Sequence, residues 1–181
     1  DYVVQIREYL DFGDAPAPYP TLTADSGASH LLSGGLWLGD YVDPEPDGQP
    51  EPDARGDDFA GYGDDEDGVD FTSVLSQGAI ATVDVVASAA GLLNAWVDFN
   101  ADGDWADAGE QILQDLAVAP GWNSLSFAVP TNATVTEATF SRFRLSHQSG
   151  VTFDGSAPDG EVEDHAVAIV AGDFDATIGG R

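Results

Sequence analysis

The stretch that decides the fold is the second half of the chain, which opens with AIATVDVVA (79–87) and LLNAWVDF (92–99). Both segments are rich in β-branched and aromatic residues and partly alternate apolar with polar positions, as strands do. The same character recurs in QILQDLAV (111–118), NSLSFAVP (123–130), ATFSRFRLS (138–146) and EDHAVAIV (163–170). Gly and Pro separate these segments, and no convincing amphipathic helix pattern occurs. The sequence therefore predicts an all-β fold, an antiparallel β-sandwich that is jelly-roll-like.

The first half of the chain has a different composition. Residues 11–77 are rich in Pro, Gly and Asp, with LLSGGLWLG (31–39) as the main apolar exception. Residues 40–70 hold thirteen carboxylates against one cation, Arg55. Such a charge run is typical of a solvated loop, and a loop this long is either functional or disordered. We expect a strand or linker at 1–10, one sandwich domain at 11–170 and a tail or linker at 171–181.

The charge balance limits the classes of molecule that the protein can bind. Five Lys and Arg residues against 33 Asp and Glu give a net charge of −28. A surface this acidic repels phosphate backbones and anionic headgroups, so nucleic acid is a poor partner and divalent cations are good ones. The longest apolar runs are too short to cross a bilayer, which predicts no direct membrane insertion. No signal peptide is visible at Asp1, so we expect a mature or excised segment of an exported protein, extracellular or at the cell surface.

Missing residue types exclude some chemistry. Because the chain has no Cys, it forms no disulfide and binds no zinc through thiolates. It also has no Lys, which excludes Lys–Asn cross-links and Schiff-base catalysis. His30, His147 and His165 lie far apart in the sequence and lack an HExxH motif, and no G-x-S-x-G elbow occurs. The sequence thus predicts that the protein is not an enzyme.

The motif with the sharpest chemistry is DFNADGDWADAGE (98–110). Its oxygen-bearing side chains stand at every second position, with Gly103 after the third, which is how an EF-hand-type loop begins to wrap calcium. The acid expected at position 12 comes one residue later, because that position is Gly109. The predicted calcium ligands are Asp98, Asn100, Asp102, Asp104 and Glu110. The alternative is an Asp- and Gly-rich turn that holds no metal.

A second acidic group is dispersed over DFGDAP (11–16), GDDEDGVD (63–70) and DGEVEDH (159–165). If the fold brings these segments together, their carboxylates repel one another unless a cation lies between them. We predict a second cation site there, with Asp14, Asp65, Asp67, Glu161 and Asp164 as ligands. The alternative is that these acids stay apart in water.

Several of these motifs together resemble a known family. DFGDAP (11–16), the GASH…LWLG stretch (27–39), DEDGV (65–69), WVDFNADGDWADAGE (96–110), RFRLS (142–146) and GEVEDH (160–165) are similar to the motifs of the GEVED domain. The resemblance covers about residues 11–170. It implies an extracellular β-sandwich from large secreted and surface proteins of bacteria, without known catalysis and with calcium bound. His165 departs from the Tyr that the family commonly has at this place.

The two ends of the chain look alike. Asp1-Tyr-Val-Val-Gln-Ile6 aligns with Asp164-His-Ala-Val-Ala-Ile169, so the chain begins on a strand that resembles the end of a preceding module. A lone strand of this kind pairs readily with a sheet edge. We expect Tyr2, Val4 and Ile6 to fill alternate pockets of such an edge, either in a head-to-tail homopolymer or between tandem modules. The other interpretation is a first strand of the same domain.

Three classes of function remain. A calcium-stabilised structural or adhesive module explains the acidity, the calcium loop and the end match. A carbohydrate-binding module explains the sandwich and the tryptophans Trp37, Trp96, Trp105 and Trp122, but it requires at least two coplanar aromatic rings on one exposed face. A hydrolase requires a pocket with a carboxylate pair of shifted pKa. Asn132 is a candidate site of N-glycosylation, because it stands in the one N-x-[ST] sequon of the chain.

Overall fold

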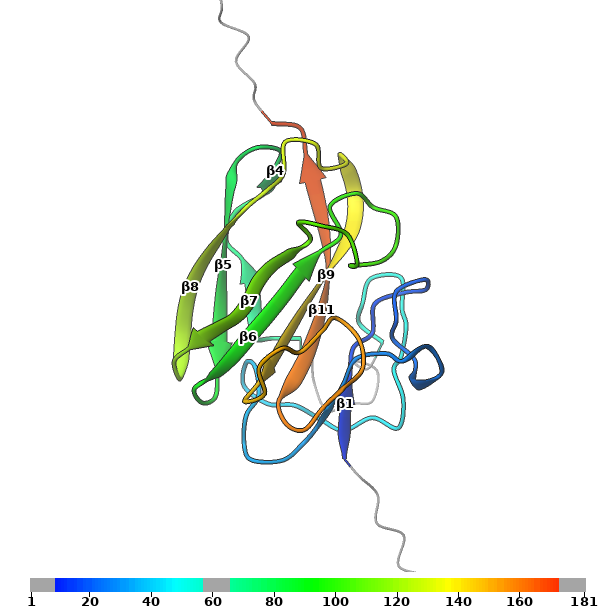
Figure 1. Cartoon of the computed structure of the whole chain (residues 1–181), viewed down its shortest axis with the longest axis vertical. Helices are drawn as coiled ribbons and strands as arrows, with labels where there is room; N and C mark the ends of the chain where they lie inside the picture. Colours follow the sequence, from blue (N-terminus) through cyan, green and yellow to red (C-terminus); the bar gives the residue numbers. More distant parts are fainter. Residues whose placement is uncertain (1–8, 57–65, 173–181) are drawn as a thin grey trace, which may run out of the picture.

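The computed structural model describes residues 9–56 and 66–172, and within them the protein is built of strands (Figure 1). The single helical element there is a 3-10 turn, Thr23–Asp25. The strands are β1 (Leu10–Phe12), β2 (Ser29–Leu31), β3 (Val69–Phe71), β4 (Leu75–Ser76), β5 (Ile80–Ala87), β6 (Gly91–Val97), β7 (Gln111–Val118), β8 (Gly121–Ala128), β9 (Thr136–Ser146), β10 (Ser156–Ala157) and β11 (Glu161–Val170).

Two sheets form the sandwich. The larger has the strand order β4-β11-β9-β6-β7, and the smaller has the order β3-β5-β8. Their facing sides share one apolar core, because alternate residues of each strand point inward. In β5 these are Ala81, Val83, Val85 and Ala87, and in β9 they include Phe143 and Leu145. The alternation of apolar residues in the sequence therefore predicts which side chains form this core.

The other face of the larger sheet is covered as well. A third, small sheet with the order β1-β2-β10 lies at the end where β11 begins, together with the segments that join its strands (Figure 1). A second cluster of buried rings fills the space between this cover and the sheet, with Tyr19, Trp96, Trp105 and Phe140 as its largest members. The part of the larger sheet under this cover is thus buried on both sides, and polar residues in β9 and in the first half of β11 are enclosed.

The expected all-β class and all six predicted strands are confirmed, each within two residues at either end. One part of the prediction needs correction, because the pairing is not wholly antiparallel. β4 pairs in parallel with β11, and β10 pairs in parallel with β2. Both pairs involve two-residue strands that reach their partners through long connections, which suit parallel pairing. Tyr2, Val4, Ile6 and Asp65 lie outside the described residues.

Across the described ranges, no helix is long and apolar enough to cross a membrane.

Candidate functional site

A buried ion pair joins the two longest strands. Arg142 on β9 lies directly opposite Asp164 on β11, and both side chains are inaccessible to solvent. The guanidinium binds the carboxylate with two hydrogen bonds, of 2.7 Å from Nε and 2.6 Å from Nη2. Its Nη1 donates to the carbonyls of Pro20 and Phe153, and its carbon lies 4.5 Å from the ring centre of Trp105. Because all these donors are used, the charge is compensated without water.

The DFGDAP segment contacts this ion pair through its backbone. Ala15 N–H donates to Asp164 Oδ2 at 2.9 Å, and Asp11 Oδ2 accepts a hydrogen bond of 2.7 Å from Val162 N–H. Gly13 lies between these contacts. A Cβ at this position would stand 2.4 Å from Asp164 Oδ2 and 2.8 Å from Arg142 Nη2, so only glycine allows the loop to approach.

The two glutamates of the GEVED motif hold two other loops. Glu161 Oε2 accepts a hydrogen bond from Leu38 N–H, and Glu163 Oε1 accepts one of 2.9 Å from Gly68 N–H. Both side chains are buried. Burial raises the pKa of Glu163, and His165, whose Nε2 lies 3.1 Å from Glu163 Oε2, offsets part of this rise. His165 also packs its ring edgewise against Phe71 and Phe143, in the place where the family commonly has Tyr.

Arg144 forms a second buried polar group on the same side of β9. Its Nε donates to His30 Nε2 at 2.9 Å, and its other nitrogens donate to carbonyls of Ser29, Thr152, Asp154 and Gly155. Because His30 accepts at Nε2, its Nδ1 carries the proton and donates to Asp159 O at 2.7 Å. Burial, followed by the charge of Arg144, lowers the pKa of His30, which keeps the ring neutral.

We call this region the acidic junction. Its members are Asp11 to Ala15, His30, Leu38, Gly68, Arg142, Arg144 and Glu161 to Asp164. It brings together the three motifs of the predicted second cation site. Asp14 Oδ2 accepts from Gly56 N–H at 2.6 Å, and Asp67 Oδ1 accepts from Asp40 N–H at 2.9 Å. The carboxylates described above accept hydrogen bonds from the charged guanidinium of Arg142 and from neutral backbone N–H groups. A metal ion at the junction stays a prediction.

The 98–110 loop follows β6, and its Trp105 packs on Arg142 of the acidic junction. Asp98 is buried and shapes the loop, because its Oδ1 accepts from Ala101 N–H at 2.6 Å and its Oδ2 from Gly103 N–H at 3.0 Å. Tyr19 donates its hydroxyl to Asp98 Oδ2 at 2.6 Å. Burial, and then this hydrogen bond, raise the pKa of Tyr19, so the hydroxyl remains a donor.

The exposed part of the loop gathers oxygens around Asn100. Its Nδ2 donates to Asp102 Oδ2 at 2.9 Å and to Asp107 Oδ2 at 2.6 Å, so two carboxylates meet at one amide. Asp104 Oδ1 accepts a hydrogen bond of 2.8 Å from Ala106 N–H. The sequence prediction named Asp104 as a ligand and did not name Asp107, whose Oδ2 lies 2.6 Å from Asn100 Nδ2.

Glu110 closes the loop from inside. Its Oε1 accepts from Phe99 N–H and its Oε2 from Asp107 N–H, each at 3.2 Å. Burial raises the pKa of Glu110 to about 7, and the nearby charges of Asp98 and Asp107 add to this rise. A small cavity of about 70 Å³ lies between Glu110, Asn100, Asp107 and the turn at Asn132.

The donor set of this loop fits calcium by type. It consists of carboxylate and amide oxygens, and the pKa of Glu110 is raised first by burial and then by the charges of Asp98 and Asp107. Within residues 9–56 and 66–172, however, no three Asp, Glu or His side chains converge closely enough to hold a metal by themselves. The Asn100 amide stands between the acids here, so its oxygen is needed to complete a metal site.

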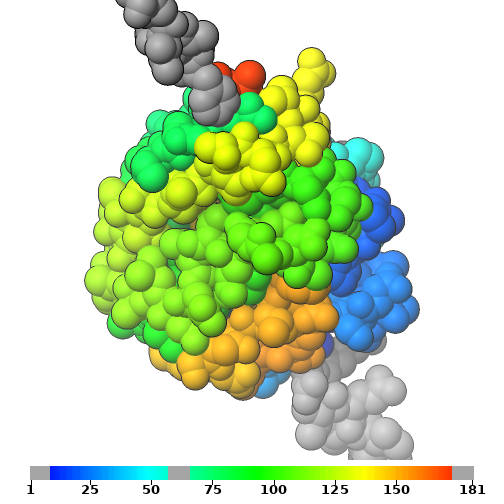
Figure 2. Space-filling view, turned by 45° about the horizontal axis from the view of Figure 1, so that its top comes forward, coloured from blue at the N-terminus to red at the C-terminus, as the bar shows by residue number. Residues whose placement is uncertain are grey.

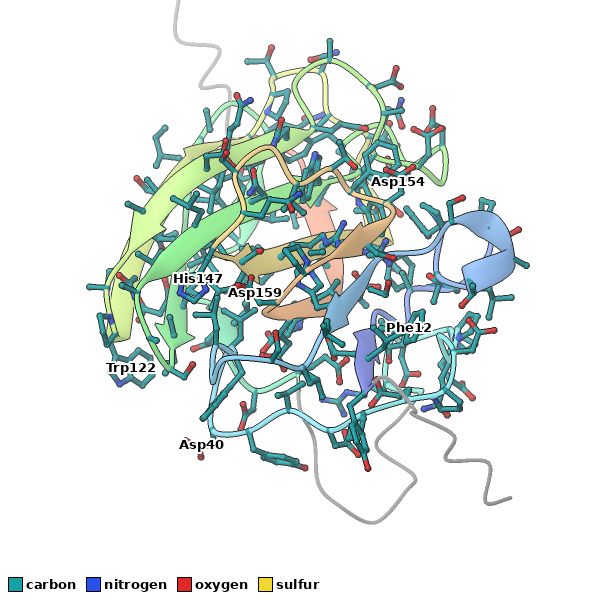
Figure 3. The ribbon with its side chains drawn as sticks, turned by 60° about the horizontal axis from the view of Figure 1, so that its bottom comes forward. Phe12, Asp40, Trp122, His147, Asp154 and Asp159 are labelled. Atoms are coloured by element: carbon teal, nitrogen blue, oxygen red, sulfur yellow. The ribbon has the colours of Figure 1, made fainter. Side chains whose placement is uncertain are left out.

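The remaining candidates from the sequence are the four tryptophans, His147 and Asn132. Trp96 and Trp105 are buried, Trp37 is half-buried, and Trp122 is 73% exposed and projects from the body of the molecule (Figure 3). His147 lies next to Asp159, with Nδ1 2.8 Å from Oδ2 (Figure 3). Asn132 is exposed in a turn, so the sequon is accessible. The platform of coplanar tryptophans that a carbohydrate-binding module requires is not formed by Trp96 and Trp105.

Sequence reasoning missed the two arginines that hold the acidic junction. A signal was present, because Arg142 and Arg144 are two of only five cations and alternate with the apolar Phe143 and Leu145 of the same strand. Residues two apart share a face of a strand, so both charges had to lie on one buried side.

Comparison with known families places the 98–110 loop and the GEVED motif in one domain family. Residues 92–168 match the GEVED domain. The resemblance inferred from the motifs is thereby confirmed over this segment, which runs from β6 into β11 and contains both the 98–110 loop and Asp164. DFGDAP, LWLG and DEDGV lie before the matched segment, and hydrogen bonds attach them to its GEVED motif. Comparisons with curated proteins and with solved structures found no match.

Proposed function

We propose that this protein is a non-catalytic, calcium-stabilised structural or adhesive module of a secreted or surface protein, a repeat unit or a subunit of a head-to-tail assembly. The GEVED match supports a domain of this kind. The observation that carries calcium is the crowding of oxygens at the 98–110 loop, where Glu110 has a pKa raised to about 7 next to Asp98 and Asp107.

In this proposal the loop is organised in two layers. Asp98 shapes the backbone through its two N–H contacts, whereas Asn100, Asp102 and Asp107 supply the outward oxygens. Reversal of the Asn100 amide would present Oδ1 to both carboxylates, because the two orientations differ only in the exchange of nitrogen and oxygen. Calcium supplies the charge that compensates these acids, and the chain supplies their positions.

The test is calorimetry of the whole chain in EGTA and in calcium. A ligand that binds only the native state stabilises it by about 2.7 kcal/mol at a concentration of one hundred times Kd. We expect calcium to raise Tm, and Asp102→Asn to weaken that rise, because the Asp102 carboxylate is exposed and accepts a hydrogen bond from the Asn100 amide. Asp70→Asn, an exposed acid on β3, is the matched control. Equal transitions with and without calcium would refute the proposal.

A carbohydrate-binding module is the second candidate, and one cavity supports it. A pocket of about 320 Å³ is lined by Trp96, Trp105 and Phe153, with Asn94, Gln111, Gln114 and Thr152 as polar neighbours. This lining combines rings and amides, as sugar sites do. Titration of oligosaccharides against the chain and against Gln114→Ala decides this candidate, which fails if no sugar binds.

A further inference from the structure

An uncharged groove runs along the outer edge of β11. Its volume is about 260 Å³, and its lining is Phe71, Ser73, Val74, Leu75, Ala166, Val167, Ala168 and Val170. None of these residues is charged, in a chain that carries 33 carboxylates. Val74 is 70% exposed and Val170 is 41% exposed, so large apolar side chains lie in water along this groove. An exposed apolar patch of this kind marks an interaction surface.

The backbone of β11 is incompletely paired at the groove. β9 pairs with β11 along its length, whereas on the other side the pairing among residues 9–56 and 66–172 is that of β4 with Ile169 and Val170. Val162 N–H points away from β9, because it donates to Asp11 Oδ2. Alternate residues of a strand direct their N–H groups to the same side, so Ala166 N–H faces the groove. The groove therefore offers both backbone hydrogen bonds and apolar contacts to an added strand.

We propose that this groove accepts residues 1–8 of a second copy of the chain as an added strand. This inference rests on the proposed structural role and assigns the surface that receives the strand. Residues 2–6, YVVQI, are uncharged and match the groove in polarity. In an extended segment Tyr2, Val4 and Ile6 lie on one face, and the small Ala166 and Ala168 leave room beside them.

The direction of the chain favours a second copy over the same molecule. β1 begins at one end of the molecule, and β11 ends at the other (Figure 1). Figure 2 shows the end of β11 together with the β4 region at the latter end. Asp11 contacts Val162, so the described chain starts next to the beginning of β11. The segment of a copy placed end to end reaches the groove directly, whereas the chain's own segment has to turn back. Repetition of this contact is heterologous and extends head to tail.

The test is sedimentation velocity of the full chain over a wide concentration range, with the salt near 0.15 M to screen the net charge. We expect the average mass to rise with concentration. Val74→Asp and Val170→Asp place a charge in the groove at exposed positions, and each should weaken association about tenfold or more, which corresponds to 1.4 kcal/mol. Val135→Asp is the matched control, because Val135 is 54% exposed and does not line the groove.

A synthetic peptide of residues 1–9 should suppress association of the full chain, and the same peptide with Val4→Asp should not. A chain that stays monomeric at every concentration overturns the inference, and so does equal association of the groove variants and the wild type. Circular dichroism shows whether each variant folds, and two variants keep the test valid if one does not. The series is run in EGTA and in calcium, so that failure of calcium binding and failure of the groove are seen separately.

Discussion

The acidic junction and the 98–110 loop are both built around carboxylates, yet they neutralise them differently. At the junction, Asp164 is fully buried and its charge is matched by Arg142 with two hydrogen bonds. At the loop, Asp102 and Asp107 are exposed, and their closest polar neighbour is the neutral amide of Asn100. The junction carries its own cation, whereas the loop leaves the compensating charge to solution. We infer that the junction fixes the fold and that the loop is the part that responds to conditions.

The largest expected effect is at the junction. Asp164→Asn keeps the shape of the side chain but leaves the Arg142 guanidinium buried without its counter-charge. Loss of one partner of a buried ion pair costs about 3–5 kcal/mol. We expect the free energy of unfolding, measured with denaturant, to fall by about this amount.

The exposed Asp70→Asn is the control for Asp164→Asn and should change the stability by less than about 0.5 kcal/mol. If both substitutions cost the same, the junction does not have the structural importance assigned to it.

An intermediate effect is expected at Glu110. A carboxyl whose folded pKa is raised stabilises the fold fully below its unfolded pKa, and this contribution is lost as pH rises through the folded pKa. For Glu110 the loss runs from about 4.5 to about 7. Glu110→Gln removes the charge but keeps only one oxygen for the Phe99 and Asp107 N–H groups. It should therefore stabilise the calcium-free protein at pH above 7 by only on the order of 1 kcal/mol, because the lost acceptor and the water at the loop offset part of the gain.

The same substitution has the opposite effect in calcium, because the ionised Glu110 is then needed in the site. Thermal unfolding in EGTA and in calcium, below pH 4.5 and above pH 7, gives this reversal directly. Glu137→Gln, an exposed acid on β9, serves as the reference. A calcium-free Glu110→Gln protein with the pH dependence of the wild type contradicts the argument.

The smallest effect is expected at Asp104. Its substitution tests whether this side chain only stabilises the loop backbone or also binds the metal. Its carboxylate is exposed and accepts the Ala106 N–H. Asp104→Ala should lower the free energy of unfolding by about 0.5–1 kcal/mol, the usual value of a hydrogen bond. Because the Asn100 amide donates to Asp102 and Asp107 and the Asp104 carboxylate binds Ala106 N–H, calcium titration should give a nearly unchanged Kd, whereas a large loss of affinity would place Asp104 among the ligands.

Much of the fold was determined by the sequence itself. The alternation in 79–87 and 123–130 places apolar side chains on one face whatever the partner strand is, so these strands and their part of the core could be predicted locally. The turn formed by the 98–110 motif could also be predicted from the sequence, because its backbone contacts are local. Asp98, for example, binds the N–H groups of Ala101 and Gly103.

Only the tertiary structure decided what the distant acids do. Ala15 and Asp164 are 149 positions apart, and Leu38 and Glu161 are 123 apart, so no local pattern states that these carboxylates will accept these backbone N–H groups. The antiparallel register of β9 and β11 sets Arg142 opposite Asp164, and a shift by one residue would move the guanidinium to the other face. The sequence shows which charges exist, whereas long-range pairing selects their partners, because burial makes an unmatched charge too costly to keep.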